Sequence, residues 1–420
     1  MRVAMLSVHT SPLAQLGGWE TGGMNVYVRE LSLTLGSRGV EVDVFTRRQD
    51  SQIETVTPIG ENARLIQLDA GPARHFDKYA VLEYLPDLAC NLQRFRNFSG
   101  APYDVIHAHY WLSGRLALPF RDRWRAPLVS TFHTLGRMKN DVAEDDAERE
   151  EATRIEIERR VMSCSDRLIA STPVDESQLI KLYGVPSRKI SVIPPGVDLD
   201  EFRPLRKSSA RKRLGFGEGP LVLFVGRIQR LKGIDVLLRA IAALDDLAPG
   251  LRPTVAIIGG AMEHERVAAE QREMQRLKQL SQALGIASQV RFLGGVPQDS
   301  LRSYYSAADV TVMPSTYESF GLVALESMAC GTPVVATRVG GLSTLIRDAE
   351  TGYLVPWRDP SLFAQRIAAL LTDGPLRRRM QRRAREHACG YAWTSAAAAT
   401  ERVYQQLVTS RVALEPTACV

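Results

Sequence analysis

The sequence has few cysteines and no long apolar segment. Its five cysteines are scattered and odd in number, and none is spaced as C-x-x-C: Cys90, Cys164, Cys330, Cys389 and Cys419. This usage argues against a disulfide framework or a zinc site and fits reduced thiols in a cytoplasm. The apolar runs have the length of strands, so no transmembrane helix is expected. The first run, residues 2–8, is too short for a signal peptide.

Internal repeats and low-complexity segments are also lacking, and 420 residues suffice for two domains of ordinary size. The net charge of +6 suits phosphorylated substrates or an anionic membrane surface, and it does not distinguish between these two kinds of partner. Part of that charge lies in an arginine-rich run at residues 377–385. Because no aromatic residues are interleaved with it, we interpret the run as a solvated helix face and expect no nucleic-acid partner.

Strand-like and helical runs alternate along the whole chain, which predicts an α/β fold with parallel sheets. Each half holds enough βα units for its own doubly wound sheet. A polar, basic stretch at residues 195–220 separates the halves, and we place the domains at residues 1–198 and 199–392. The end of the chain, residues 393–410, is predicted to be a helix.

The most informative segment is residues 318–326, Glu-Ser-Phe-Gly-Leu-Val-Ala-Leu-Glu. It follows a strand-like run and leads into a helix that should stop at the glycine and proline of residues 331–333. Glu318 is then predicted at the mouth of a strand, and Glu326 about two turns into the helix.

Three backbone amides of this segment lie at the predicted helix N-terminus, where anions bind well: those of Phe320, Gly321 and Leu322. Amides for a diphosphate and carboxylates for hydroxyl groups are the chemistry that holds a nucleotide sugar. The segment resembles the E-x7-E motif of the retaining glycosyltransferases of family 4. The residues between the two glutamates also match those that this family usually has there.

The resemblance covers nearly the whole chain and implies a GT-B fold, in which two Rossmann-like doubly wound domains face a central cleft. It implies a UDP-sugar donor, no required cofactor or metal (a structural Mg²⁺ is allowed but not indicated), and a homodimer as the family expectation. It also implies that the helix at residues 393–410 packs on the first domain. The acidic run at residues 144–146 is therefore interpreted as a solvated loop.

Two cations stand at a predicted strand-to-helix turn in the second half, Arg227 and Lys232. Cations are disfavoured at a helix N-terminus unless an anion is expected there. The surrounding residues match the family's G-R-x4-K-G pattern, which implies that both cations bind the donor diphosphate and stabilise it as it leaves. By the same resemblance Glu318 accepts hydrogen bonds from the donor sugar and Glu326 from the ribose, and Val296 flanks the base.

A glycine-rich loop feeds a predicted helix N-terminus in the first half, a place for phosphate. The loop is not G-x-G-x-x-G and lacks the acidic residue that binds a dinucleotide ribose, so we reject NAD binding. Gly23 allows close approach to the donor diphosphate. The wording Gly-Gly-Met-Asn-Val-Tyr-Val at residues 22–28 is similar to one branch of the family, the D-inositol-3-phosphate glycosyltransferases of mycothiol synthesis. The residues after His9 resemble that branch too.

That resemblance implies an acceptor-phosphate site made of two cations and two hydroxyl donors: Lys78, Tyr110, Thr134 and Arg154. Such a set can neutralise and orient a dianion. His9 and Asn25 are assigned to the same acceptor, and Lys139 adds charge nearby. His133 ends a predicted strand and is expected to position the donor sugar and stabilise charge, not to attack it.

The sequence leaves the substrates open. The hexosyl unit is N-acetylglucosamine or glucose. Sucrose-phosphate synthase, which uses UDP-glucose and fructose 6-phosphate, shares the fold and much of this wording, and Met24-Asn25 favours inositol phosphate over it. A non-catalytic nucleotide-sugar-binding module is the alternative from another functional class.

Overall fold

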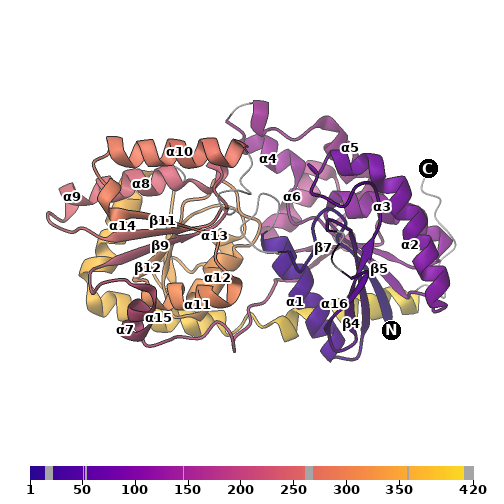
Figure 1. Ribbon diagram of the computed structural model, residues 1–420. Helices are drawn as coiled ribbons and strands as arrows, with labels where there is room; N and C mark the ends of the chain where they lie inside the picture. The colour runs from indigo at the N-terminus through magenta and orange to yellow at the C-terminus, as the bar shows by residue number, and fades with distance from the viewer. Residues whose placement is uncertain are drawn as a thin grey trace. The chain divides into compact units, whose positions relative to one another are not determined.

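The computed structural model describes residues 1–14, 22–50, 52, 54–144, 146–260, 268–356 and 359–410 (Figure 1). Most of the glycine-rich loop predicted before Gly22 lies outside these residues, as does Asp145 of the acidic run. The described residues form two compact units. One contains residues 1–14, 23–194 and 393–410, and the other contains Gly22 and residues 195–392.

The first unit is built on an eight-stranded sheet of order β3-β4-β2-β1-β5-β6-β7-β8. Its strands are β1 (Arg2–Leu6), β2 (Glu41–Arg47), β3 (Val56–Gly60), β4 (Ala63–Leu68), β5 (Val105–His109), β6 (Leu128–Thr131), β7 (Arg167–Ala170) and β8 (Ile190–Val192). Parallel strands are covered on both faces, so they are apolar almost throughout, which is why the sequence shows them clearly.

The sequence reading missed one strand at an edge of this sheet, and this strand is not parallel. Strand β3 pairs antiparallel with β4 and is followed by a tight turn at Asn62, whose φ is 53°. The strand contains Pro58, and proline, which lacks the N–H that a ladder needs, is tolerated on edge strands. The alternation that the sequence reading relies on is therefore interrupted there.

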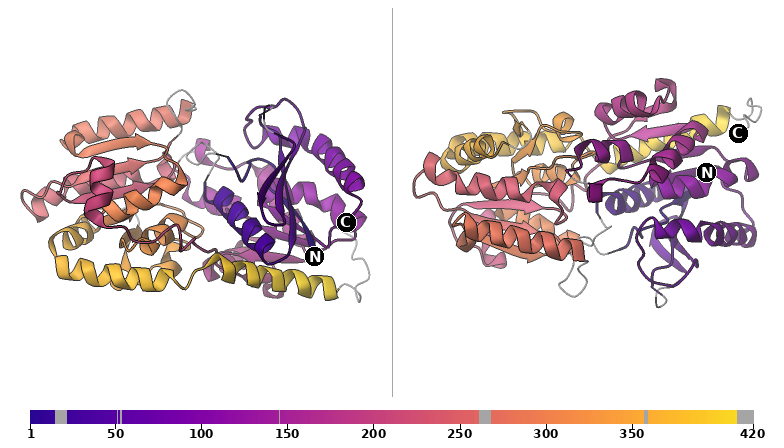
Figure 2. Two further views of the ribbon diagram at one scale, coloured as in Figure 1. Left: turned by 60° about the horizontal axis from the view of Figure 1, so that its bottom comes forward. Right: turned by 90° about the horizontal axis from the view of Figure 1, so that it is seen from above.

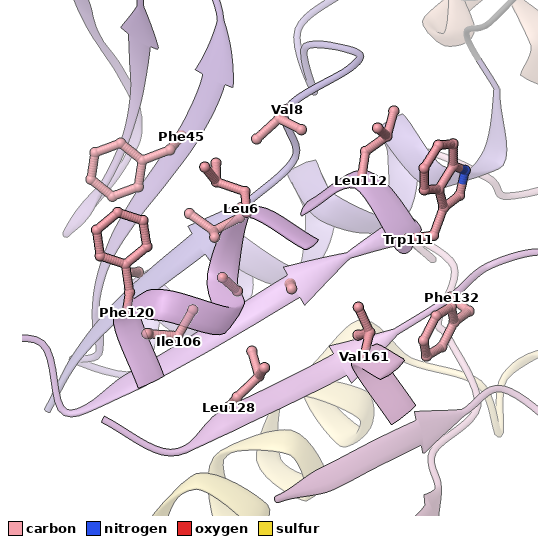
Figure 3. Close-up of a cluster of buried hydrophobic side chains, with 14 of the residues drawn as sticks. Leu6, Val8, Phe45, Ile106, Trp111, Leu112, Phe120, Leu128, Phe132 and Val161 are labelled. Carbon is pink, nitrogen blue, oxygen red and sulfur yellow. The ribbon is translucent and has the colours of Figure 1, made fainter. Parts of the chain in front are cut away.

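Helices cover both faces of the first sheet (Figures 1 and 2). They are α1 (Gly23–Ser37), α2 (Leu85–Ser99), α3 (Tyr110–Arg123), α4 (Gly136–Val142), α5 (Ala152–Cys164), α6 (Pro173–Tyr183) and α16 (Trp393–Ser410), with short 3-10 helices η1 (Ala80–Tyr84), η2 (Asp146–Glu148) and η3 (Ser187–Lys189). Helix α16 packs against α1, partly through the edge-on ring contact of Trp393 with Tyr27. On the other face, Leu6, Trp111 and Phe120 belong to one buried apolar cluster (Figure 3).

The second unit has a six-stranded parallel sheet of order β11-β10-β9-β12-β13-β14. The strands are β9 (Leu221–Val225), β10 (Thr254–Ile258), β11 (Val290–Gly294), β12 (Val310–Met313), β13 (Val334–Thr337) and β14 (Gly352–Val355). Its helices are α7 (Lys207–Leu214), α8 (Ile234–Ala242), α9 (Leu244–Leu247), α10 (Ala268–Ala283), α11 (Gln298–Ala307), α12 (Leu322–Ala329), α13 (Leu342–Leu345), α14 (Pro360–Thr372) and α15 (Gly374–Ala388), with 3-10 helices η4 (Arg230–Lys232) and η6 (Ala287–Gln289). One buried cluster joins α8, α10 and α14 to the sheet, and another joins α7, α11, α12 and α15 to it.

The arginine-rich run lies on α15, with four of its side chains exposed: Arg378, Arg379, Arg382 and Arg383. The other two make hydrogen bonds to the ends of neighbouring helices. Arg377 donates to the carbonyl of Leu371 in α14, and Arg385 to that of Ala329 in α12. Among the described residues, none of the helices combines the length and the hydropathy that crossing a lipid bilayer requires.

In each sheet the strand order reverses at one point, between β1 and β5 in the first unit and between β9 and β12 in the second. Doubly wound sheets bind their ligands at the carboxyl ends of the strands, at this point of reversal. The residues that follow β1, β5, β9 and β12 are therefore the first place to look for a site.

Candidate active site

The rings of His9 and Tyr110 lie 4.5 Å apart at the reversal point of the first sheet. His9 follows β1, and Tyr110 follows β5 directly, with a φ of 76° that is unusual for a residue other than glycine. Burial, together with the charges of Lys78 and Arg154, lowers the pKa of His9 to about 3, so its ring is neutral at pH 7. Its Nδ1 has no hydrogen-bond partner among the described residues.

Arg154 connects two of the other residues predicted to bind phosphate. Its side chain is fully buried, and its Nη1 donates to the hydroxyl of Tyr110 at 3.0 Å. Nη2 donates to Thr134, to the hydroxyl at 3.0 Å and to the backbone carbonyl at 2.9 Å. The structure therefore brings together Arg154, Tyr110 and Thr134, which come from three separate elements.

The fourth predicted residue, Lys78, reaches this group through a carboxylate that the sequence reading missed. Lys78 Nζ lies 2.7 Å from the carboxylate of Glu150, which also forms an ion pair with Lys139 and lies 3.0 Å from Arg154 Nη1. Tyr79 donates its hydroxyl to the same carboxylate at 2.6 Å. We call Lys78, Lys139 and Arg154 the cation cluster.

The electrostatics of the cation cluster are strongly coupled. Burial by itself would raise the pKa of Glu150, but Arg154, Lys78 and Lys139 outweigh burial and hold that pKa well below its usual range. Burial and the charge of Lys78 lower the pKa of Lys139 to about 8, although Glu150 opposes this shift. Glu150 is therefore ionised at neutral pH, and Lys139 loses its proton at a pH only slightly above neutral.

A second buried carboxylate, Glu158, fixes the orientation of Arg154. It accepts from Arg154 Nε at 2.8 Å, from the backbone N–H of Gly136 at 3.1 Å, and from the hydroxyl of Tyr183. Its side chain is fully buried. Arg154 thus donates four hydrogen bonds, to Glu158, Tyr110 and Thr134, and its Nη1 also forms an ion pair of 3.0 Å with Glu150.

His133 follows β6 with a φ of 62°, and its Nε2 lies 3.0 Å from Nδ1 of His109 at the end of β5. Burial lowers the pKa of His133 to about 3, so the ring is neutral and suited to hydrogen bonding. His109 was missed by the sequence reading. The available signal is the His-Ala-His alternation in β5, because residues two apart on a strand share a face.

His107 shares that face and connects it to the C-terminal helix. Its Nδ1 lies 2.6 Å from the hydroxyl of Tyr404 in α16, and its Nε2 lies 2.9 Å from the hydroxyl of Thr131 in β6. The histidine pair next to the site is thus supported by α16.

Asn25, predicted to bind the acceptor, is buried near the start of α1. Its Nδ2 donates to the hydroxyl of Thr10 and to the carbonyl of Ser11, both at 2.7 Å. The two protons of the amide are used within the loop after β1, so an acceptor hydroxyl would have to donate to Oδ1. Gly23 is the first residue of α1, two positions before Asn25.

In the second unit, Lys232 and Glu318 form an ion pair of 2.6 Å at the reversal point. Arg227 follows β9, separated from it by Gly226. The strand ends approach one another closely, since a Cβ on Gly259 would lie 1.7 Å from the carbonyl oxygen of Gly226. Lys232 was expected to open the following helix, but it ends η4, and Gly233 (φ 67°) separates it from α8.

Glu326 lies nearer the start of its helix than predicted. Helix α12 begins at Leu322 after Gly321, whose φ of 99° allows the chain to enter the helix, so Glu326 is the fifth helical residue and not two turns in. The helix ends at Ala329, before Gly331, as predicted. The Glu326 side chain is buried and accepts from the hydroxyl of Tyr305 at 2.7 Å and from Gln298 Nε2 at 3.4 Å.

The loop between β12 and α12 rests on a glycine pair that the sequence reading also missed. A Cβ on Gly340 would lie 1.9 Å from the carbonyl oxygen of Glu318, and one on Gly341 would lie 2.4 Å from Cα of Phe320. Phe320 is buried, and Val296 is half-buried against the same apolar cluster. The sequence signal that could have identified this contact is a Gly-Gly pair shortly after a strand, because glycine lets another backbone segment approach closely.

Comparison with known proteins supports the family expected from the sequence. A model described as Glycosyltransferase Family 4 matches residues 21–201, and one described as Glycosyl transferases group 1 matches residues 206–387. The D-inositol 3-phosphate glycosyltransferase of Kribbella flavida is 42% identical over 412 residues, which cover 96% of this chain and 95% of that relative. The chain belongs to glycosyltransferase family 4.

Two further similarities place this family 4 chain more closely. A D-inositol 3-phosphate glycosyltransferase from Geodermatophilus obscurus is 44% identical over 400 residues, 93% of this chain and 86% of the relative. The structure of sucrose-phosphate synthase from Thermosynechococcus elongatus matches with a TM-score of 0.89 and 35% identity, over 97% of this chain and 99% of that one. The predicted GT-B fold and the predicted glycosyltransferase class are confirmed.

Proposed function

We propose that this family 4 enzyme transfers N-acetylglucosamine from UDP-GlcNAc to a hydroxyl of 1D-myo-inositol 3-phosphate, with retention at the anomeric carbon. The observation that carries the acceptor assignment is the cation cluster at the reversal point of the first sheet. Lys78 and Arg154 lie there with the hydroxyls of Tyr110 and Thr134. A dianionic phosphate is the ligand that two or three cations and two hydroxyls suit.

Residues of the second unit would hold the donor. Arg227 offers a fork of donors to the diphosphate, and Lys232 offers a point charge next to it. The N-terminus of α12 adds unpaired backbone N–H groups to the same diphosphate. Glu318 and Glu326 are the carboxylates for the sugar and the ribose. No metal enters the proposal.

In the proposed reaction the acceptor hydroxyl attacks the anomeric carbon on the face from which UDP leaves. The bond from that carbon to the β-phosphate oxygen breaks as the new glycosidic bond forms. The leaving phosphate takes the proton of the acceptor hydroxyl. Arg227, Lys232 and the helix amides stabilise the charge that develops on the phosphate. Neutral His133 contributes hydrogen bonding near the sugar.

The test is a transfer assay in which UDP release is followed with purified protein and UDP-GlcNAc. Inositol 3-phosphate should support turnover, and myo-inositol should support little, because it cannot engage the cation cluster. Equal turnover with both acceptors would contradict the proposed phosphate site.

Synthesis of sucrose phosphate is a second candidate, favoured by the TM-score of 0.89 and the 35% identity to a sucrose-phosphate synthase. It uses the same donor residues and the same cation cluster with fructose 6-phosphate as acceptor. Assays that pair UDP-glucose with fructose 6-phosphate and UDP-GlcNAc with inositol 3-phosphate separate the two candidates directly.

A further inference from the structure

Glu150 occupies the centre of the cation cluster, where the proposed acceptor phosphate would bind. Its carboxylate contacts Lys78, Lys139 and Arg154, and its side chain is almost completely buried. Each of these cations is one that a phosphate would use. The carboxylate and the phosphate therefore compete for the same partners.

The hydrogen bonds of Arg154 show which group must move. Its four hydrogen bonds go to Glu158, Tyr110 and Thr134, and its contact with Glu150 is an ion pair of 3.0 Å, so a phosphate oxygen that approaches Nη1 on that side takes the place of the Glu150 carboxylate. Glu158 is held by Gly136 and Tyr183, and the carbonyl of Thr134 belongs to the backbone. Glu150 is the remaining anionic acceptor.

The backbone of Glu150 is held in place, so a displacement would involve only its side chain. Asn140 holds that backbone from both sides: it accepts from the N–H of Glu150 at 2.6 Å and donates to its carbonyl at 3.1 Å. Residue 150 also precedes helix α5, which begins at Ala152. Withdrawal of the carboxylate from the cluster therefore requires rotation about the side-chain bonds of Glu150.

The charges match this exchange. The cation cluster carries three positive charges, and Glu150 and Glu158 carry two negative ones, so the site has a net charge of +1. With the carboxylate of Glu150 withdrawn, the remaining charge is +2, which balances the charge of about −2 on a phosphate monoester at neutral pH. A neutral or singly charged group would gain nothing over the carboxylate that is already in place.

We propose that Glu150 is a specificity-determining residue of the acceptor site, whose carboxylate is displaced from Lys78, Lys139 and Arg154 by the phosphate of the acceptor. This inference rests on the proposed function, because it assigns the acceptor phosphate to the cation cluster. The carboxylate keeps the three cations from repelling one another before the acceptor binds. It also means that an acceptor must carry more negative charge than one carboxylate in order to bind in its place.

The test compares Glu150→Gln with the wild-type protein and with Glu151→Gln, a matched control that removes the same charge from the exposed neighbouring residue. Two readouts are used: the rise of the thermal midpoint with inorganic phosphate at constant ionic strength, and the KM for inositol 3-phosphate. We expect Glu150→Gln to bind inorganic phosphate on the order of tenfold more tightly and to lower the KM by a similar factor, while Glu151→Gln changes neither.

A Glu150→Gln protein with unchanged or weaker phosphate binding would overturn the inference, because the carboxylate would then support the site and not compete for it. If Glu150→Gln does not fold, Glu150→Asp takes its place. Its shorter side chain weakens the contacts with the lysines and should shift both readouts in the same direction by a smaller factor. An unchanged or higher KM and weaker phosphate binding in Glu150→Asp would equally overturn the inference.

Failure of the proposed function gives a different pattern. If the wild-type protein does not use inositol 3-phosphate but Glu150→Gln binds inorganic phosphate more tightly, the displacement stands and only the acceptor has been misassigned. If the wild-type protein uses inositol 3-phosphate and Glu150→Gln raises the KM, the acceptor assignment stands and the displacement is wrong.

Discussion

Replacement of Arg154 and of Lys78 by methionine should have different consequences, although both residues are assigned to the acceptor phosphate. Arg154 is fully buried and binds Glu158, which is also fully buried. Removal of one partner of a buried ion pair costs about 3–5 kcal/mol, since it leaves an uncompensated charge. Lys78 is partly exposed and shares Glu150 with two other cations, so its loss costs about 1 kcal/mol or less.

These free energies translate into thermal midpoints that can be measured by circular dichroism. For a domain of this size, 1 kcal/mol corresponds to roughly 2–4 °C. Arg154→Met should therefore lower the midpoint of the first unit by roughly 6–20 °C, and Lys78→Met by a few degrees at most. Both variants should raise the acceptor KM, by roughly tenfold for Lys78→Met, because a charge-assisted hydrogen bond to phosphate is lost. The donor KM should stay near the wild-type value.

The comparison has a clear refuting result. If Arg154→Met unfolds at the wild-type temperature, the buried network of Arg154 and Glu158 does not stabilise the unit as argued. If Lys78→Met raises the KM of the donor and the acceptor equally, Lys78 does not belong to the acceptor site. Lys78→Arg is the matched control, since it keeps the positive charge and should retain most of the acceptor affinity.

Three further predictions concern single side chains. Lys232→Met should lower kcat on the order of 10²–10³-fold with the thermal midpoint nearly unchanged, and UDP release at saturating substrates checks this. His109→Phe removes the 3.0 Å contact that orients His133 and should lower kcat by about 10²-fold with both KM values little changed. His109→Asn, whose amide can still form a hydrogen bond with His133, should recover part of the rate. The pKa of Lys139 is about 8, so its positive charge is present below pH 8 and lost above it; the acceptor KM should rise above pH 8, and Lys139→Arg should remove that rise.

The parts of the structure that could be predicted are those that local sequence determines. Strands such as β1 and β12 are short apolar runs, and α12 ends where Gly331 follows it. Among the residues assigned to the donor, Arg227 lies just after β9 and Leu322 begins α12, where turn chemistry locates them, whereas Lys232 ends η4. Strand β3 was not predicted, because Pro58 interrupts its apolar pattern and because it lies at the edge of the sheet, paired only with β4 among the described strands.

The partners of the site residues could not be predicted, because they depend on contacts between distant elements. Glu150 lies four residues after the acidic run at residues 144–146, which was interpreted as a solvated loop, and only the fold brings Lys78 to it from 72 residues away. His109 meets His133 because β5 and β6 are neighbours in the sheet. The sequence identifies the residue types at the strand ends, whereas the pairing among them follows from the sheet order.

Both units show the same arrangement, a carboxylate paired with the cations that a phosphate is proposed to bind. Glu150 is bound to Lys78 in the first unit, and Glu318 to Lys232 in the second. Cations gathered without an anion would repel one another and pay the full desolvation penalty, so an internal carboxylate lets the site exist before its ligand arrives. The same carboxylate weakens the binding of every ligand whose negative charge is smaller than its own, because such a ligand cannot displace it from the cations. The selectivity of such a site therefore depends on its glutamates as much as on its lysines and arginines, and substitution of the cations alone would not reveal it.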